Sequence, residues 1–450
     1  MLSRIFLKKA KKIHFVGIGG ISMSALAKLL LRQGKEVTGS DIKASAITNE
    51  LKTLGIRINI KHKAKAVDGA DIVVYTGAIN EKNVELQRAR LLGIKMIERS
   101  TLLSIVSQEY KNVIAIAGAH GKTTTTAMLA KVMIDSGLDP TVHLGGEVDF
   151  LGGNLKIGGE EYFITEACEY NRSFLTLRPD YSIILNVEPE HLDTYGTFEN
   201  VKKAFKNFAK NTSKKVIYNK NYILDITKDF ATFDLYLPCD YYVKNLKNNN
   251  GCYSFDVFKH DKYIHSFSLN VPGLHNVYNA LAVISIADTL TLDMKAVSRS
   301  LQSFTGVKRR YEMLGVYNNA TIIADYAHHP TEISCLLDAI RGFYDGELTI
   351  VFQPHTFSRT KAFFDDFINV LSRENIDNLI LLPTYSAREK PEQGKSALDI
   401  YKAMPTKKKA KYAVNFGTLL QEVNKISSSK SMIVFVGAGN VYDFACRLLK

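Results

Sequence analysis

Short apolar segments that end in glycine or an acidic residue alternate with helix-like segments through most of this chain. A strand is predicted by "KIHFVGIGG", and a helix by the apolar spacing of "SMSALAKLLLRQG" that follows it. The strand pattern returns in "ADIVVYTGAI", "EYFITEA", "YSIILNVEPEH" and "SMIVFVGAGN". Strands that alternate with helices form parallel sheets with helices on both faces. The alternation therefore predicts an α/β fold.

The 450 residues divide into three predicted units in series, as expected for domains of about 100–200 residues. We expect domains at 1–107, 108–306 and 307–450. In the middle unit, "GCYSFDVFKHDKYIHSFSLNVPG" alternates residue by residue about a polar turn, which predicts an antiparallel hairpin and hence a mixed sheet. A glycine and three basic residues interrupt the helical pattern in "SFTGVKRRYEMLG", and Thr305–Lys308 is the predicted hinge.

Composition narrows the class of protein. The net charge of +13 favours small polyanions such as nucleotides over nucleic acid, because lysine clusters such as "KKAKK" carry no interleaved aromatic residues. The five cysteines contain no CxxC pair, so we expect free thiols rather than a zinc site or disulfides. No apolar run reaches the ~18 residues of a membrane span, and the N-terminus lacks a signal-peptide core. A cytoplasmic protein, monomeric or weakly homo-oligomeric, is expected.

The segment "GAHGKTT" follows the strand predicted at 113–117 and begins a helix. Backbone N–H groups from Gly118 to Thr123 can surround a phosphate, Lys122 can neutralise it, and the Thr123 hydroxyl can bind Mg²⁺. The helix dipole adds to the attraction for an anion. The loop is shorter than the usual GxxxxGK[ST] pattern. We predict a nucleoside triphosphate site, with a structural glycine turn as the alternative.

Acidic residues follow two of the predicted strands. Glu166 ends "YFITEA", and "NVEPEHLD" presents Glu188, Glu190, His191 and Asp193 after the next strand. In a parallel sheet, ligands collect at the carboxyl ends of the strands. Because Mg²⁺ takes oxygen ligands, Glu166 suits a magnesium site well. His191 by itself is more typical of a packed or hydrogen-bonded side chain.

The glycines of "HFVGIGGISMSALA" fit the start of a GxGxxG fingerprint, with Asp41 about 20 residues later. Gly17 and Gly19 match the pattern, whereas Ser22 stands at its third position. The segment predicts a pyrophosphate at a helix N-terminus, and a tight turn without a ligand is the alternative. Nothing further along the chain supplies the second half of a dinucleotide site.

Taken together, several motifs resemble those of the Mur ligase family, in order and over essentially the whole chain. They are the two glycine-rich segments above and "TEACEYNRSF", "NVEPEHLDTY", "PGLHNVYNALAV", "GVKRRYEMLG", "DYAHHPTEI" and "FQPHTFSRT". The resemblance implies a Rossmann-like first domain for a UDP-sugar, a central P-loop ATPase domain, and a Rossmann-like third domain for an amino acid. It implies ATP- and Mg²⁺-dependent ligation of L-alanine to the carboxylate of UDP-N-acetylmuramate through an acyl phosphate, in peptidoglycan precursor synthesis.

The resemblance also implies roles for individual residues. The ATP-binding set is Gly118, Ala119, His120, Gly121, Lys122, Thr123, Thr124, Asn276, Asn279 and Arg309. The UDP-sugar set is Gly17, Gly19, Gly20, Asp41 and Thr76, and the amino-acid set is Tyr326, His328, His355 and Arg359. The metal set is Thr123, Glu166 and His191, and the catalytic set is Lys122, His191 and Arg310. His191, His328 and His355 are the candidate bases for the amine.

The chain departs from the family pattern at several positions. Ala119 replaces the common Thr or Ser, "EACEY" replaces "EADES", and Thr356 stands where some members have Arg. Some members carry a carbamylated lysine, for which Lys202, Lys203 and Lys206 lie at suitable distances. A ligase of the same family that attaches a whole tripeptide remains an alternative. An NAD(P)-dependent oxidoreductase and an ATP-driven binding protein are alternatives from other classes.

Overall fold

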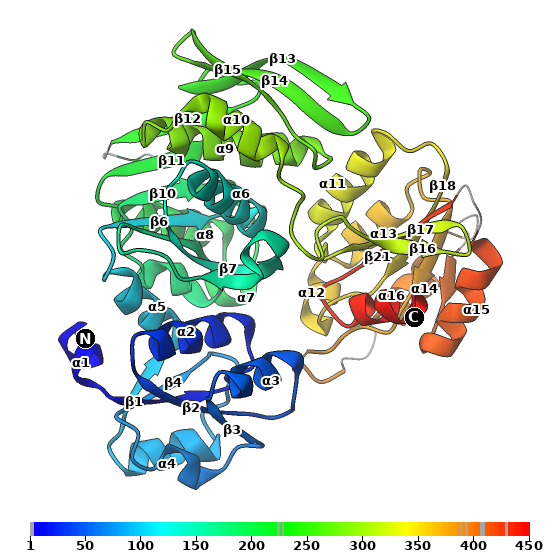
Figure 1. The fold of residues 1–450 in the computed structure, drawn as a ribbon. Coiled ribbons are helices and arrows are strands. Elements are labelled where there is room, and N and C mark those ends of the chain that lie inside the picture. Colours follow the sequence, from blue (N-terminus) through cyan, green and yellow to red (C-terminus); the bar gives the residue numbers. More distant parts are fainter. Residues whose placement is uncertain are drawn as a thin grey trace. The chain divides into compact units, whose positions relative to one another are not determined.

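The computed structural model describes residues 4–222, 226, 229–387, 389–391, 395–405, 410–427 and 431–450. Internal contacts divide the chain into two compact units. The first unit is Met1–Lys244, Asp256–Ser266 and Tyr278–Leu301, and the second is Asn245–Phe255, Phe267–Val277 and Gln302–Lys450. Within the described residues the strands form three sheets, separated along the sequence (Figure 1). The predicted α/β class is confirmed, whereas the three domain ranges stay a prediction.

The first sheet is parallel throughout and has the order β3-β2-β1-β4-β5. Its strands are β1 (Lys12–Val16), β2 (Glu36–Asp41), β3 (Arg57–Ile60), β4 (Ile72–Tyr75) and β5 (Lys95–Glu98). Its helices are α1 (Arg4–Lys9), α2 (Ile21–Arg32), α3 (Ala46–Thr53), α4 (Val84–Leu91) and α5 (Arg99–Ser107), with the 3-10 turn η1 (Ala64–Val67). The strand order reverses between β1 and β4, and ligands of such sheets bind at this switch point. Gly17 and Thr76 follow these two strands.

The second sheet is mixed and has the order β15-β14-β13-β12-β11-β10-β6-β9-β7-β8. Its strands are β6 (Asn112–Ala117), β7 (Thr141–Val148), β8 (Gly153–Lys156), β9 (Tyr162–Ala167), β10 (Tyr181–Ile184), β11 (Lys215–Asn219), β12 (Phe230–Asp234), β13 (Tyr241–Asn249), β14 (Cys252–Lys259) and β15 (Lys262–Ser268). In this spatial order, the neighbouring strands from β13 through β12, β11, β10, β6 and β9 to β7 pair in parallel. The edge strand β8 pairs antiparallel to β7. His260 and Asp261 join β14 to β15 with positive φ, as in tight hairpins, so the predicted hairpin and mixed sheet are confirmed.

The helices that follow these strands set the position of the phosphate loop. They are α6 (Lys122–Asp135), α7 (Leu192–Tyr195), α8 (Phe198–Lys210), α9 (Leu274–Thr289) and α10 (Met294–Gln302), with η2 (Asp149–Leu151) and η3 (Tyr170–Thr176). Strand β6 is completely apolar after Asn112 and is buried between β10 and β9. Buried on both faces, it places the loop that precedes α6 at the middle of the sheet's carboxyl edge.

The third sheet has the order β16-β17-β21-β18-β19-β20. Its strands are β16 (Glu312–Tyr317), β17 (Ala320–Asp325), β18 (Glu347–Phe352), β19 (Asn378–Leu381), β20 (Ala410–Tyr412) and β21 (Ser431–Val436). Its helices are α11 (Pro330–Arg341), α12 (Phe357–Ala362), α13 (Phe364–Leu371), α14 (Ala397–Ala403), α15 (Phe416–Ile426) and α16 (Val441–Leu448). Among the described strands of this third sheet, only the edge strand β16 pairs antiparallel with its neighbour. Apolar residues of β18 and β21 form the core on both faces.

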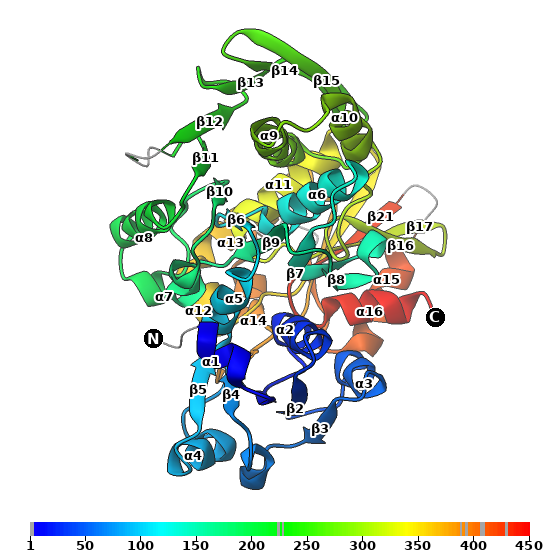
Figure 2. The ribbon, with the colours of Figure 1, turned by 60° about the vertical axis from the view of Figure 1, so that its left-hand side comes forward.

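Helix α2 connects the first two sheets within the first unit. It packs against β2 and also contacts β7 and β8 at the edge of the second sheet (Figure 2). Helix α5 similarly contacts η3. The glycine-rich loop before α2 and the phosphate loop before α6 therefore belong to one compact body.

Two compositional predictions can be compared with the structure. All five cysteines are free thiols, as the absence of a CxxC pair predicted. In the described part of the chain, no helix combines the length and the apolar character that crossing a bilayer requires.

Candidate functional site

The loop between β6 and α6 has a backbone that only glycine fits well. Gly118 has φ +151° and Gly121 has φ +82°. A Cβ on Gly118 would lie 3.1 Å from Leu185 Cβ, and one on Gly121 would lie 2.6 Å from Asn279 Oδ1. Gly121 precedes the first turn of α6, whose N–H groups have no partner within the helix. The loop thus presents helix N–H groups and a dipole to an anion.

Lys122, the first residue of α6, is surrounded by oxygen atoms. Its ammonium donates to the carbonyls of Gly118 and Ala119, the latter at 2.9 Å. It also lies 2.8 Å from Glu169 Oε2 and 3.1 Å from Glu169 Oε1. These contacts hold the ammonium inside the loop, where it can meet a phosphate.

Glu169 is the buried partner of this lysine. Only 4% of its side chain is exposed. Burial acts to raise the pKa of Glu169, but the charge of Lys122 and hydrogen bonds from His191 and Lys122 hold that pKa below its usual value. Burial acts to lower the pKa of Lys122, and the charge of Glu169 raises it above the usual value. Both groups are therefore charged at neutral pH.

Glu166 lies near the end of β9 and contacts Thr123 in the first turn of α6. Its Oε2 accepts a hydrogen bond of 3.1 Å from the Thr123 hydroxyl. Its Oε1 accepts one of 2.5 Å from the Gly145 N–H on β7. The structure thus brings together Thr123 and Glu166 as the sequence predicted, and it adds Gly145 to the pair.

His191 belongs to a second acidic group. Its Nε2 lies 3.5 Å from both Glu169 Oε1 and Glu190 Oε2. The ring packs edge-on against Tyr170, with centroids 5.0 Å apart. The side chain of Asp193 lies outside the described residues. Of the predicted metal set, Thr123 and Glu166 are hydrogen-bonded to each other, and His191 lies beside Glu169 and Glu190.

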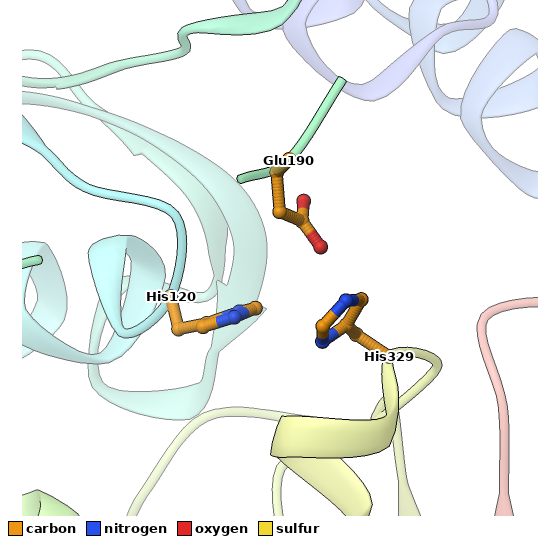
Figure 3. A group of neighbouring side chains, drawn as sticks. All are labelled: His120, Glu190 and His329. Atoms are coloured by element: carbon orange, nitrogen blue, oxygen red, sulfur yellow. The ribbon is translucent and has the colours of Figure 1, made fainter. Parts of the chain in front are cut away.

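His120 is held by residues that follow β10. Its backbone N–H donates to Asn186 Oδ1 at 2.8 Å, and Asn186 Nδ2 donates back to the His120 carbonyl at 3.1 Å. Its imidazole Nε2 lies 3.3 Å from Glu188 Oε2. Figure 3 shows the imidazole of His120 and the carboxylate of Glu190 directed into the same space, with ligand atoms within 4.8 Å. His329, also drawn there, belongs to the second unit, where it caps α11.

The donor set around the loop fits a magnesium ion. Mg²⁺ prefers carboxylate, hydroxyl and water oxygens, usually with one or two carboxylates. The Thr123 hydroxyl and the Glu166 carboxylate lie together beside the phosphate loop. Ligand atoms of Glu169, Glu190 and His191 lie within 4.8 Å of one another. Both groups adjoin the place where a triphosphate would lie, and the metal role of each residue stays a prediction.

The glycine-rich loop after β1 is closed by its own hydrogen bonds. The N–H groups of Gly17 and Ile18 donate to the Ser40 carbonyl at 2.8 and 3.0 Å. The Gly19 N–H donates to Asp41 Oδ2 at 2.8 Å, and the Gly20 N–H points back to the Gly17 carbonyl. A Cβ on Gly17 would lie 3.6 Å from Thr76 Cγ2. The structure thus gathers the predicted residues, and it leaves the first-turn amides of α2 as the donors for a pyrophosphate.

Two asparagines lie in the first turns of α9. Asn276 donates to the Pro272 carbonyl at 2.7 Å. Asn279 is 6% exposed and faces Gly121. Asn279 therefore lies directly against the phosphate loop, while the predicted contact of Asn276 with adenine stays a prediction.

In the second unit, the predicted amino-acid residues lie side by side. Tyr326 and His328 pack with ring centroids 5.3 Å apart, and His328 and His355 with centroids 5.9 Å apart. Burial, together with the charges of His328 and Arg359, lowers the pKa of His355 to about 4. Thr356, where some family members have Arg, caps α12 by accepting from the Arg359 N–H.

The two junction arginines lie next to this group. The Arg310 guanidinium lies 5.0 Å from the Tyr326 ring centroid and 3.7 Å from Glu332. Arg309 stacks 4.2 Å over Tyr442. Their predicted roles toward the nucleotide stay predictions.

Family models account for most of the chain. Residues 12–111 match the model described as "Mur ligase family, catalytic domain". Residues 116–287 match "Mur ligase middle domain", and residues 309–439 match "Mur ligase, glutamate ligase domain". The chain belongs to the Mur ligase family, as its motifs indicated.

Three individual proteins within this family are similar to the chain. The chain is 40% identical over 456 residues to the UDP-N-acetylmuramate–L-alanine ligase of Caldanaerobacter subterraneus subsp. tengcongensis, with 99% of each chain covered. It is 32% identical to the crystal structure of a UDP-N-acetylmuramate–alanine ligase from Thermotoga maritima, with a TM-score of 0.83 and 98% of each chain covered. A murein peptide ligase from Psychrobacter arcticus shares the fold at 23% identity and a TM-score of 0.75, with 98% of each chain covered. These comparisons do not favour the alternatives from the sequence, namely a tripeptide ligase, an NAD(P)-dependent oxidoreductase and an ATP-driven binding protein.

Two residues that follow strands at the site were not predicted from the sequence. They are Glu169, which pairs with Lys122, and Asn186, which holds His120. Each follows a strand that flanks β6 in the sheet, and this position was the available signal. The same position predicts Glu166 and Glu188, and it applies equally to Glu169 and Asn186.

Proposed function

We propose that this protein joins L-alanine to the carboxylate of UDP-N-acetylmuramate at the expense of ATP, in peptidoglycan precursor synthesis. One observation carries the proposal, namely 40% identity over 99% of the chain to curated ligases of that name. The phosphate loop with Lys122 and the separate glycine-rich loop support it, because the reaction needs two nucleotide sites. We also propose domains at 1–107, 108–306 and 307–450, with a hinge at Thr305–Lys308.

The first step brings two anions together. The sugar-nucleotide carboxylate attacks the γ-phosphorus of ATP, which forms an acyl phosphate and releases ADP. Lys122 and the first-turn amides of α6 hold the phosphates, and Arg310 offsets further negative charge. Magnesium, held by Thr123, Glu166 and His191, would add positive charge at the phosphates when bound. Catalysis of this kind depends on positioning and electrostatics, so the oxygen cage around Lys122 is its main device.

The second step requires a neutral amine. The alanine nitrogen attacks the acyl carbon, phosphate leaves, and one proton of the nitrogen passes to a base or to water. His355, with a pKa of about 4, is neutral at physiological pH and has a nitrogen lone pair to offer. In our proposal Tyr326, His328 and Arg359 hold the amino acid beside it. Asn276, Asn279 and Arg309 hold ATP, and Asp41 and Thr76 flank the UDP-sugar.

The proposed function is tested by phosphate release from ATP in the presence of UDP-N-acetylmuramate. Alanine, serine, glycine and a wall tripeptide are compared as acceptors at equal concentration. We expect the largest kcat/KM for alanine. Preference for the tripeptide would establish the recycling ligase instead, and ATP turnover without any sugar nucleotide would argue for an ATP-driven binding protein.

We expect Arg359→Ala to raise the KM for alanine about 10- to 100-fold and to change the KM for ATP less than about twofold. Its guanidinium is the fixed cation beside His355, and hydrogen bonds to a charged group contribute about 1.5–3 kcal/mol. Steady-state kinetics with each substrate varied in turn gives both values. The matched control is Arg341→Ala in the same unit, because Arg341 donates to the Asn375 carbonyl and to the Asp377 carboxylate. Equal changes in both KM values would remove Arg359 from the amino-acid pocket.

A further inference from the structure

A chain of hydrogen bonds runs from the first turn of α2 to the end of β9. Arg99 Nη1 donates to Ser22 Oγ at 3.0 Å, and Ser22 Oγ lies 2.9 Å from His143 Nε2. His143 Nδ1 lies 3.1 Å from Thr165 Oγ1. The Thr165 hydroxyl donates at 3.2 Å to the carbonyl of Glu166. Ser22, at the third position of the glycine fingerprint, is thereby linked to a residue of the phosphate site.

Donors and acceptors along this chain follow from its two ends. A guanidinium only donates, so Ser22 accepts from Arg99. Thr165 donates to the Glu166 carbonyl, so its oxygen accepts from the Nδ1–H of His143, and in a neutral imidazole Nε2 is then the acceptor for the Ser22 hydroxyl. This arrangement requires a neutral imidazole, and burial together with the charge of Arg99 lowers the pKa of His143 to about 4. A change at one end therefore affects every bond along the chain.

Strand β7 supplies a second connection between the same two places. His143 pairs in register with Thr165 on β9. Two residues further along β7, the Gly145 N–H donates to Glu166 Oε1 at 2.5 Å. At the other end, Asn154 of β8 donates to the carbonyl of Ile21 in α2 at 2.9 Å. The first turn of α2 and the Glu166 carboxylate are thus attached to the paired strands β8 and β7.

We propose that Ser22 and His143 are positioning residues that couple ligand binding at the first turn of α2 to the placement of the Glu166 carboxylate beside Thr123. This inference rests on the proposed function, which puts a sugar nucleotide at α2 and ATP at the phosphate loop. A pyrophosphate at α2 orders that turn and the bonds attached to it. Glu166 is then held for the second nucleotide, so each ligand strengthens the binding of the other by the same factor.

The test measures binding of a non-hydrolysable ATP analogue with Mg²⁺ by calorimetry, with and without saturating UDP-N-acetylmuramate and with alanine omitted. In the wild-type protein we expect the sugar nucleotide to tighten analogue binding at least about fivefold. In Ser22→Ala and in His143→Phe we expect this ratio to fall below about twofold. Ser22→Thr keeps the hydroxyl and is expected to keep the ratio.

Ser104→Ala is the matched control. The Ser104 hydroxyl donates to the Thr176 carbonyl at 2.6 Å, so it also joins α5 to η3 of the second sheet but lies outside the chain described above. We expect its ratio to match the wild type. An equal fall in Ser104→Ala and Ser22→Ala, or a wild-type ratio of one, would overturn the inference. A wild-type protein that forms product yet shows no coupling contradicts this inference alone, whereas absence of product contradicts the proposed function.

Discussion

Replacement of Lys122 by alanine is expected to lower ligase turnover at least about 10³-fold while the protein still folds. The Lys122 ammonium is the positive charge enclosed by the Gly118 and Ala119 carbonyls and by Glu169, at the first residue of α6. Without it, two anions must meet at the phosphate loop with one cation fewer. Phosphate release measures turnover, and circular dichroism with thermal melting checks the fold.

The substitution has a second consequence, because it leaves Glu169 buried without its cation. Removing one partner of a buried ion pair costs about 3–5 kcal/mol. The double variant Lys122→Met/Glu169→Gln removes both charges and is expected to recover most of that stability without recovering activity. Lys131→Ala is the matched control on the same helix, since Lys131 forms an i,i+4 pair with Asp135 and lies over the Phe150 ring, away from the phosphate loop. Turnover in a folded Lys122→Ala protein within tenfold of wild type would refute the assigned ATP site.

The phosphate loop could be predicted because its parts are contiguous. A strand, two glycines, a lysine and a threonine follow one another, and local backbone preferences assemble them into one loop. Glu169 could not be found in this way. Its partner Lys122 is 47 residues away in the sequence. The position of Glu169, three residues after Glu166, does not show which side of the loop its carboxylate faces.

Strand order explains how residues from distant segments meet at the loop. The sheet has the local order β10-β6-β9, so strands on both sides of β6 end beside the loop. Glu166 and Glu169 come from β9 and the residues after it, whereas Glu190 and His191 come from the segment after β10. Alternating strands predict a parallel sheet, but they do not specify which strands become neighbours. The sequence therefore predicts that these residues lie at one edge, but it does not predict that Glu169 lies with Glu190 and His191.

Ser22 is a second residue whose structural role could not be predicted from the local sequence. In the sequence it is a departure from a glycine pattern, and it counts against a dinucleotide site. In the structure it bonds His143, which is 121 residues away on another sheet. A long-range contact between sheets depends on how α2 packs against β7, and no local pattern encodes this packing.

The second large effect is expected at Glu85, where substitution by alanine should lower the free energy of unfolding by about 3–5 kcal/mol at pH 7. Glu85 is fully buried on α4. Its carboxylate accepts from the Ser40 hydroxyl at 2.5 Å and from the Lys63 N–H at 3.0 Å, and it lies 3.6 Å from His14 Nε2. Alanine removes the acceptor of the Lys63 N–H and the short bond from the Ser40 hydroxyl, and it takes the negative charge away from His14. Urea denaturation measures the loss.

The loss should depend on pH in a defined direction. Burial opposes ionisation, but the neighbouring His14 imidazole and hydrogen bonds from Ser40 and the Lys63 N–H hold the pKa of Glu85 below its usual value of 4.5. A carboxylate of this kind contributes stability above its unfolded-state pKa, and the contribution disappears as pH falls through the folded-state pKa. The difference between the wild type and Glu85→Gln should therefore shrink below about pH 4.5. A constant difference down to pH 3 would show that charge is not its origin.

Glu50→Ala provides the matched control on another helix of the same sheet, α3, because Glu50 forms a surface ion pair with Lys28 and is 54% exposed. We expect this variant to lose no more than about 1 kcal/mol of unfolding free energy.

Glu85 also bears on function, since it bonds the side chain of Ser40, and the Ser40 carbonyl accepts from Gly17 and Ile18. In Glu85→Gln, which keeps the shape of the side chain, the KM for UDP-N-acetylmuramate should rise while that for alanine stays within twofold. A similar rise in both values would mean that Glu85 supports the fold and does not position the glycine-rich loop.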